Sequence, residues 1–207
     1  MAGTKGIAPD AATPWYLPVA RAIAAVAVAL TVTFSADHSA PLGFITFGLF
    51  AVATGVVLAA VTLRAPGRDT ARTITLVQAA VLIVAGVIAL VMINAGLPFL
   101  ILLVTGVAAI TGFLELYLGL RGRGRDRAAR DHVFVGVLTA LLALGVLLVP
   151  PGFVQSFIGP DGVVRQLTAS IIVVGGLGAY WAILGVYLAI AGLSLKWSAD
   201  TATPSEA

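Results

Sequence analysis

The chain has 207 residues, of which 60% are hydrophobic and only 10% are charged, whereas an average soluble domain carries ~25% charged residues. A water-soluble fold of this length cannot bury so much apolar surface, so that class is excluded. Cysteine is absent, which also excludes disulfides, thiolate metal sites and cysteine nucleophiles. The net charge of +3 does not indicate nucleic-acid binding, because the basic residues lie beside apolar segments rather than on a polar face with aromatic residues.

The apolar residues form six blocks, and each is long enough for a helix that crosses a bilayer, which takes ~20 residues. The sequence therefore predicts an all-α fold, an integral membrane six-helix bundle. The predicted spans are about 17–34, 42–63, 73–94, 98–120, 133–150 and 168–193. They form one transmembrane domain over 15–197, between polar segments 1–14 and 198–207 that are predicted to be disordered.

The first apolar block has a second interpretation, as a signal peptide that is cleaved, because the SADHSA segment after it offers small residues. A long upstream region that carries Asp10 besides Lys5 favours a retained span instead.

Lysine and arginine show which side of the membrane each connection faces. With six spans, eleven of the twelve basic residues fall on one side, and Arg165 falls on the other. Basic residues concentrate in cytoplasmic segments, so both termini are predicted to be cytoplasmic. The loop arginines between the fourth and fifth spans are also expected to attract anionic lipid headgroups. The eleven residues are Lys5, Arg21, Arg64, Arg68, Arg72, Arg121, Arg123, Arg125, Arg127, Arg130 and Lys196.

The second and fourth spans end alike, which indicates an internal repeat. Ala53-Thr54-Gly55 stands nine residues before Arg64, and Ile110-Thr111-Gly112 stands nine residues before Arg121. The sixth span gives a weaker match at Ile183-Leu184-Gly185. We interpret the chain as three copies of a two-helix hairpin, with chance similarity among Ala, Gly, Leu and Val segments as the rival interpretation.

Small residues recur every seven positions along the even-numbered spans. Residues at this spacing share one stripe of a helix, and small side chains there let a neighbouring helix approach closely. We therefore predict helix-packing surfaces on these stripes, and the alternative is that they line a narrow path through the bundle. The stripes are Gly48 and Gly55 in the second span, Thr105, Gly112 and Gly119 in the fourth, and Gly178, Gly185 and Gly192 in the sixth.

Two ionisable residues, Arg21 and Glu115, lie within predicted spans, where a charge is costly and functional sites are sought first. The third and fourth spans are predicted to form an antiparallel hairpin about a short turn, which places Gln78 level with Glu115. We therefore hypothesise a polar cluster of Arg21, Gln78 and Glu115 in the cytoplasmic half of the bundle. In the alternative, Arg21 extends to the headgroups and Glu115 turns toward the arginines of loop 121–130.

The sequence offers little to support catalysis. Phosphate-binding Gly-x-x-x-x-Gly-Lys-Ser/Thr loops, Gly-x-Ser-x-Gly elbows and His-Glu-x-x-His helices do not occur in it. Asp37 and His38 lack the further ligands that a metal site needs, and His132 is interpreted as a solvated boundary residue. We therefore expect no enzyme activity, cofactor or metal. The segment around Phe153 and Phe157 is predicted to lie on the outer leaflet.

The chain resembles the HdeD-like (DUF308) membrane proteins, which are built from short two-helix repeats. In that family a glycine, an apolar stretch and a turn with proline precede a helix rich in glycine. The residues that carry the resemblance are Gly86-Val87-Ile88-Ala89-Leu90, Thr111-Gly112-Phe113-Leu114-Glu115, and Gly136 through Gly145-Val146-Leu147-Leu148-Val149-Pro150. The resemblance covers about 73–195, and the first hairpin departs from it. It implies six spans, a bacterial inner membrane and a link to acid or general stress.

These observations lead to one expected function, one main rival and a third possibility, a membrane enzyme that acts on lipid through a polar cavity beside Glu115. We expect a structural or accessory membrane protein linked to stress. The rival is a transporter or channel subunit with the polar cluster around Glu115 at its centre. Six short spans barely enclose a polar path alone, so the rival implies a homo-oligomer.

Overall fold

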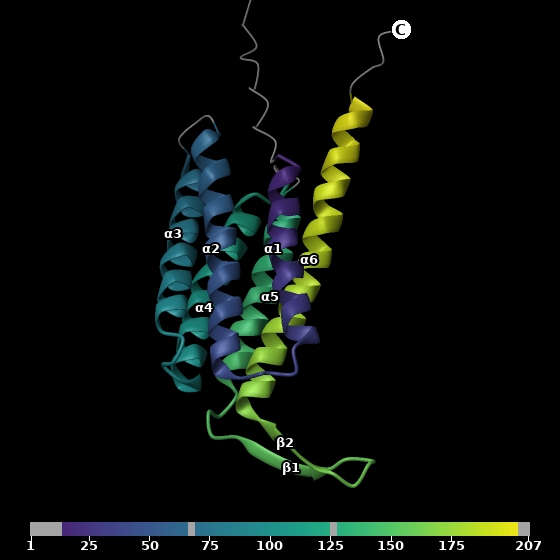
Figure 1. Cartoon of the computed structure of the whole chain (residues 1–207). Coiled ribbons are helices and arrows are strands. Elements are labelled where there is room, and N and C mark those ends of the chain that lie inside the picture. The colour runs from purple at the N-terminus through teal and green to yellow at the C-terminus, as the bar shows by residue number, and fades with distance from the viewer. Residues whose placement is uncertain (1–13, 66–68, 125–127, 203–207) are drawn as a thin grey trace, which may run out of the picture.

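The computed structural model describes residues 14–65, 69–124 and 128–202. Within them, six helices are long and apolar enough to cross a membrane, which confirms the predicted multi-span bundle. The helices alternate in direction, so α1 begins and α6 ends at the same end of the bundle (Figure 1). The elements are α1 (Tyr16–Phe34), α2 (Ala40–Arg64), α3 (Thr70–Val91), α4 (Leu97–Arg121), α5 (Ala129–Leu147), β1 (Val154–Ile158), β2 (Val164–Thr168) and α6 (Ala169–Ala202).

The two ends of the bundle differ in charge as the sequence predicted. Arg64 ends α2 and Arg121 ends α4 at one end, which we call the arginine end. Arg165 lies in β2 at the opposite end, which we call the hairpin end (Figure 1). Four of the basic residues used in the topology prediction, Lys5, Arg68, Arg125 and Arg127, lie outside the described residues.

Local chemistry moves the bounds of two helices from their predicted positions. α3 begins at Thr70 rather than 73, because the side chain of Asp69 accepts a 2.7 Å hydrogen bond from the backbone N–H of Arg72 and caps the helix. α5 begins at Ala129 rather than 133, since the charged residues before 133 can be helical where the helix leaves the hydrocarbon. It ends at Leu147 because the backbone before Pro150 and Pro151 disfavours a helix.

The predicted disordered tail 198–207 is wrong over its first part, because α6 continues to Ala202. The first helix-breaking residue after the span is Pro204, and the short polar residues before it permit a helix. At its 34 residues, α6 is about 51 Å long at ~1.5 Å per residue, so it extends beyond a hydrocarbon core of ~30 Å. The Lys196 ammonium group lies 5.2 Å from the centre of the Trp15 ring, which fixes the extension beside the start of α1.

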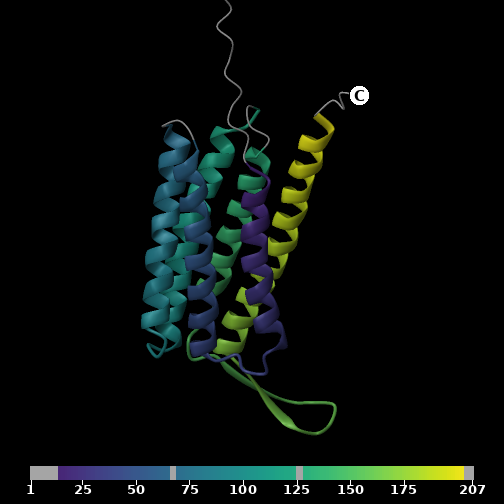
Figure 2. The ribbon, with the colours of Figure 1, turned by 45° about the horizontal axis from the view of Figure 1, so that its top comes forward.

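The connection between α5 and α6 folds into an antiparallel β-hairpin, which the sequence pattern did not predict. Val154 pairs with Thr168 and Ile158 with Val164, and the turn between them contains Gly162 at a φ of 74°, a backbone conformation that favours glycine. The hairpin projects sideways from the hairpin end (Figure 2). It is the one addition to the predicted all-α architecture among the described residues.

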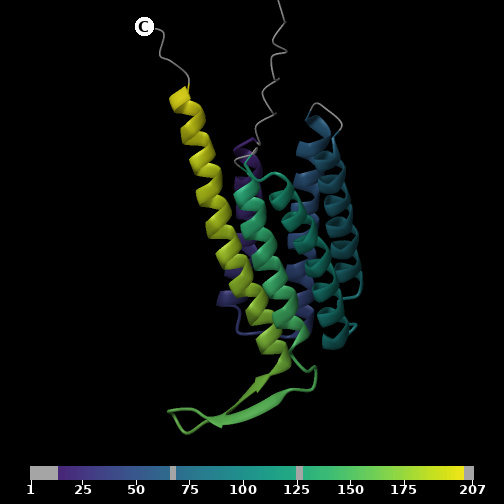
Figure 3. The ribbon, with the colours of Figure 1, turned by 180° about the vertical axis from the view of Figure 1, so that it is seen from behind.

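The glycine stripes pack helices together rather than lining a path. The most extensive helix contacts join α2 to α3, α4 to α5 and α6 to α1. Each glycine-bearing even helix therefore packs against the first helix of the next hairpin, and α6 closes the ring onto α1 (Figure 3). All the predicted packing glycines are buried: Gly48, Gly55, Gly112, Gly119, Gly178, Gly185 and Gly192.

The three glycines that define the predicted repeat make equivalent contacts. In each case a Cβ on the glycine would lie against one backbone carbonyl of the neighbouring helix and against the backbone nitrogen four residues later. The same contact geometry occurs in all three hairpins, and this confirms the predicted three-hairpin repeat. The pairs are Gly55 with Ala79 O at 2.8 Å and Ile83 N at 3.1 Å, Gly112 with Gly136 O at 3.3 Å and Ala140 N at 3.1 Å, and Gly185 with Ala22 O at 3.5 Å and Val26 N at 3.2 Å.

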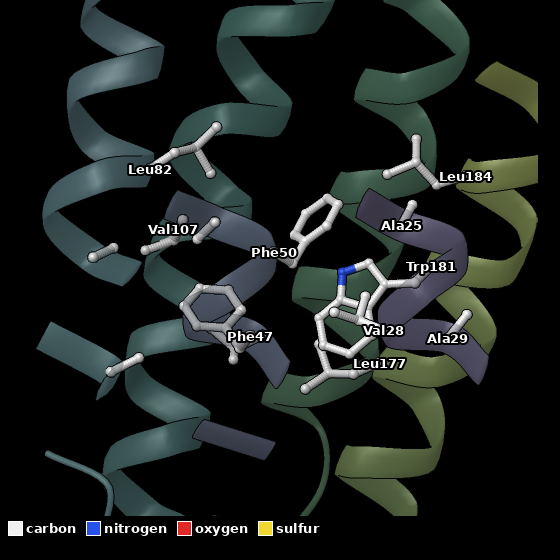
Figure 4. Packing of buried hydrophobic residues seen from close by; sticks show 14 of the residues in the cluster. Ala25, Val28, Ala29, Phe47, Phe50, Leu82, Val107, Leu177, Trp181 and Leu184 are labelled. Carbon is white, nitrogen blue, oxygen red and sulfur yellow. The ribbon is translucent and has the colours of Figure 1, made fainter. Parts of the chain in front are cut away.

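The even helices also carry equivalent buried stripes toward the interior. Buried residues recur at alternating spacings of three and four, the pattern of a helix that packs along a supercoiled seam. Phe50 lies against Trp181 there, with ring centroids 5.5 Å apart, and Leu177 and the α1 residue Val28 lie beside Trp181 (Figure 4). The stripes are Phe44, Phe47, Ala51, Thr54 and Leu58 in α2, Ile101, Val104, Ala108, Thr111 and Glu115 in α4, and Val174, Leu177, Trp181, Leu184 and Leu188 in α6.

Candidate functional site

The structure brings Arg21, Gln78 and Glu115 together. Glu115 is only 2% exposed, and its Oε1 accepts hydrogen bonds from Arg21 Nη2 at 3.1 Å and from Gln78 Nε2 at 2.9 Å. Its other oxygen, Oε2, contacts Nδ1 of His132. Both carboxylate oxygens are therefore occupied within a buried charge cluster, which we call the Glu115 cluster and define as these four residues.

Each odd-numbered helix contributes one group to the Glu115 cluster. Arg21 comes from α1, Gln78 from α3 and His132 from α5, while the carboxylate comes from α4. The α1 contribution joins helices from the first and second hairpins across the interior. The carboxylate of Glu115 thus links all three helical hairpins through polar contacts, in addition to their apolar packing.

The alternative prediction, in which Arg21 extends to the headgroups and Glu115 turns toward the loop arginines, is wrong. Arg21 is 9% exposed and bonds to Glu115, so it does not extend to the headgroups. Glu115 faces the interior, while Arg121 donates a 2.8 Å hydrogen bond to the hydroxyl of Tyr117 on the outer surface of α4. A carboxylate in an apolar bundle gains more from a buried guanidinium partner than from a solvated one.

Three members of the Glu115 cluster, Arg21, Gln78 and Glu115, occupy a single layer of the repeat. A shift of 57 residues relates Gly55 to Gly112 and Ala79 to Gly136, and the same shift relates Arg21 to Gln78 and then to Val135. On the even helices the equivalent positions hold Leu58, Glu115 and Leu188. Every member of this layer is buried, and the repeat places Arg21, Gln78 and Glu115 in it beside three aliphatic residues at the remaining positions. The six members are Arg21, Gln78, Val135, Leu58, Glu115 and Leu188.

His132 is the member that the sequence interpretation missed, because the fifth span was predicted to begin at 133. The side chain of His132 is 31% exposed, which makes it the most accessible member of the cluster and its link to the arginine end. Gly112 and Gly119 of α4 lie against the α5 backbone at 136–140 and 129–133, so Val135 rather than His132 lies level with Glu115. His132 stands three residues earlier in α5, nearer the arginine end, and its contact with Glu115 depends on the start of α5 at Ala129.

The start of α5 makes a second polar contact, on the side that faces α6 rather than α4. The hydroxyl of Tyr187 in α6 donates a 2.7 Å hydrogen bond to Asp131, and its ring stacks on Phe134 with centroids 3.8 Å apart. Asp131 is thus held by α6 while its neighbour His132 contacts α4. Deeper in the bundle, the hydroxyls of Thr139 and Tyr180 lie 3.0 Å apart and join α5 to α6 again.

The chemistry of the Glu115 cluster suits a structural ion pair better than a cation site. The carboxylate oxygens already meet a guanidinium, an amide N–H and an imidazole nitrogen, so their lone pairs face hydrogen-bond donors or a positive charge. A metal or substrate cation would have to displace Arg21. A hollow of about 540 Å³ lies elsewhere, on the outer surface of α4, and is lined by Phe113, Leu116, Tyr117, Leu120 and Arg121.

Comparison with protein-family models, curated proteins and solved structures gives no match for this chain. The fold and the composition therefore define its class, a multi-pass membrane protein with six spans.

Proposed function

We propose that this chain is a structural or accessory protein of a bacterial cytoplasmic membrane, with both termini in the cytoplasm and a link to acid or general stress. The observation that carries the structural role is the occupation of both Glu115 oxygens by side chains from α1, α3 and α5. Such a cluster ties the hairpins together and engages both carboxylate oxygens with the chain's own side chains. The stress link and the bacterial origin rest on the resemblance to the HdeD-like family.

The structural role supports a further expectation about assembly. The three glycine interfaces are alike, so apolar packing alone discriminates poorly between correct and exchanged hairpins. A buried polar group that finds its partners in only one arrangement disfavours the others. The Glu115 cluster takes one group from each odd helix and is suited to that task.

A deletion strain tests the proposed function. We expect reduced survival under acid or membrane stress, and restoration by both the wild-type gene and the paired variant Glu115→Leu with Arg21→Leu. The paired variant removes the charges but keeps an apolar layer, so a structural role tolerates it if the protein accumulates normally. Growth of the deletion strain that is unchanged under both stresses would contradict the stress link.

A transporter or channel subunit is the second candidate, and the partial exposure of His132 favours it. This residue connects buried Glu115 to the arginine end, as a proton or ion path requires. In this case Glu115→Gln and Arg21→Ala are expected to abolish proton or ion flux in liposomes. The control is Gln166→Ala on the exposed hairpin, which should leave the flux unchanged. Flux that is absent, or that survives both changes at the cluster, excludes the transport function.

A further inference from the structure

The β-hairpin at the hairpin end exposes apolar side chains that the bundle does not cover. Val154 is 58% exposed, Ile158 73% and Val164 65%. A hairpin of two strands is marginally stable in water unless it packs against another surface. Neither strand of this sheet has a third strand beside it among the described residues. Something outside the described chain is therefore needed to cover the apolar residues.

The position of the hairpin limits what can cover it. Thr168 ends β2 and Ala169 begins α6 without a linker, and the N–H of Ala169 donates a 2.9 Å hydrogen bond to the carbonyl of Phe153. These connections hold the hairpin at the level where α6 enters the membrane. From there it projects sideways past the bundle (Figures 1 and 3), over the region that lipid occupies around a membrane-spanning helix.

The register divides the side chains of the hairpin between two unlike faces. Ile158 and Val164 are paired, and Val154 shares their face because side chains alternate along a strand. This first face also holds the polar residues Ser156, Gln166 and Thr168, and it carries no charge. The second face holds two pairs, Gln155 with Leu167 and Phe157 with Arg165, and it carries the charge of Arg165. Arg165 bonds to Asp161 at 2.7 Å, so the hairpin's own acidic residue neutralises its cation.

We propose that the first face, formed by Val154, Ile158 and Val164, lies on the lipids of the outer leaflet as a membrane-surface strap. β2 continues directly into α6, and the exposed aliphatic side chains of this face are uncharged. Such side chains partition into the interfacial region. The neutral hairpin does not select for charged headgroups, so zwitterionic and anionic lipids are both suitable. This role is independent of the Glu115 cluster and of the proposed function.

Because the chain has no cysteine, single-cysteine variants can test which face meets lipid. Ser156→Cys and Gln155→Cys are a matched pair, since both positions are exposed neighbours on one strand and point to opposite faces. Each variant, with an environment-sensitive fluorophore attached, is reconstituted in phosphatidylcholine vesicles with and without brominated acyl chains. We expect a blue-shifted emission and at least twofold stronger quenching by bromine at position 156 than at position 155.

The same measurement separates lipid from other partners. Equal quenching at both positions, none at either, or stronger quenching at 155 would overturn the proposal. A blue shift at 156 that disappears when the protein is diluted with excess lipid would indicate a second copy instead of lipid, and would overturn it too. Adding Ile158→Asp to the Ser156→Cys variant is expected to reduce the quenching, because a charged carboxylate at position 158 disfavours contact between this face and the lipid. Unchanged quenching in that variant would contradict the assigned face.

Discussion

Replacing Glu115 with leucine is expected to lower the free energy of unfolding by about 3–5 kcal/mol. The substitution removes the carboxylate that accepts hydrogen bonds from Arg21 and Gln78 and contacts His132. Arg21 then stays buried without its counter-charge, and this uncompensated charge dominates the loss of stability. Reversible unfolding in mixed detergent micelles, followed by circular dichroism, measures the difference from the wild type.

Adding Arg21→Leu to Glu115→Leu is expected to recover most of that loss, because removing both charges ends the cost of burying one of them alone. Leu58, Leu188 and Val135 occupy the equivalent positions of the layer, so the repeat already packs aliphatic side chains there. Gln78 and His132 lose the same acceptor in both variants, so their contribution cancels in the comparison. A single variant as stable as the wild type, or a double variant no better than the single, would show that the ion pair does not hold the bundle.

The sequence predicts the spans well because the bilayer imposes a long apolar block on every crossing helix. The arginine bias likewise places Arg64 and Arg121 at one end, as the structure shows. Helix bounds are harder to predict, because they depend on single contacts such as the cap at Asp69. The hairpin of β1 and β2 was missed because its two strands alternate only weakly between apolar and polar residues, and its pairing depends on a turn at Gly162.

The candidate site could be predicted in part for a geometric reason. Gln78 and Glu115 lie on two helices joined by a short turn, and a short turn fixes their relative depth. Arg21 lies far away in sequence, so only its position within a span and its charge suggested a partnership. His132 stands at a helix start that sequence patterns locate poorly, and its contact with Glu115 therefore required the structure. The pairing of helices between hairpins also required it, because glycine stripes show that a helix packs closely but not against which neighbour.

Replacing Gly55 with alanine is expected to lower the free energy of unfolding by about 1–3 kcal/mol, although alanine is the better helix former. A Cβ at this position would lie 2.8 Å from the carbonyl oxygen of Ala79 and 2.7 Å from a side-chain carbon of Ile83. The carbonyl belongs to the backbone of α3, so relief requires that α2 and α3 separate. Micelle unfolding measures the loss, with Gly106→Ala as the control.

A Cβ at Gly106 in α4 meets no atom within 4 Å, so its replacement should leave stability within about 0.5 kcal/mol of the wild type or raise it slightly. Gly112→Ala and Gly185→Ala test the repeat, because their closest backbone approaches are 3.1 Å and 3.2 Å at equivalent contacts. Their losses should be smaller than that of Gly55→Ala, since the backbones must move less in each case. Gly185→Ala should cost more than Gly112→Ala, because its Cβ would also lie 2.7 Å from a side-chain carbon of Val26. If Gly55→Ala proves as harmless as Gly106→Ala, the glycine stripes do not set the distance between helices, and the ring of three equivalent interfaces loses its physical basis.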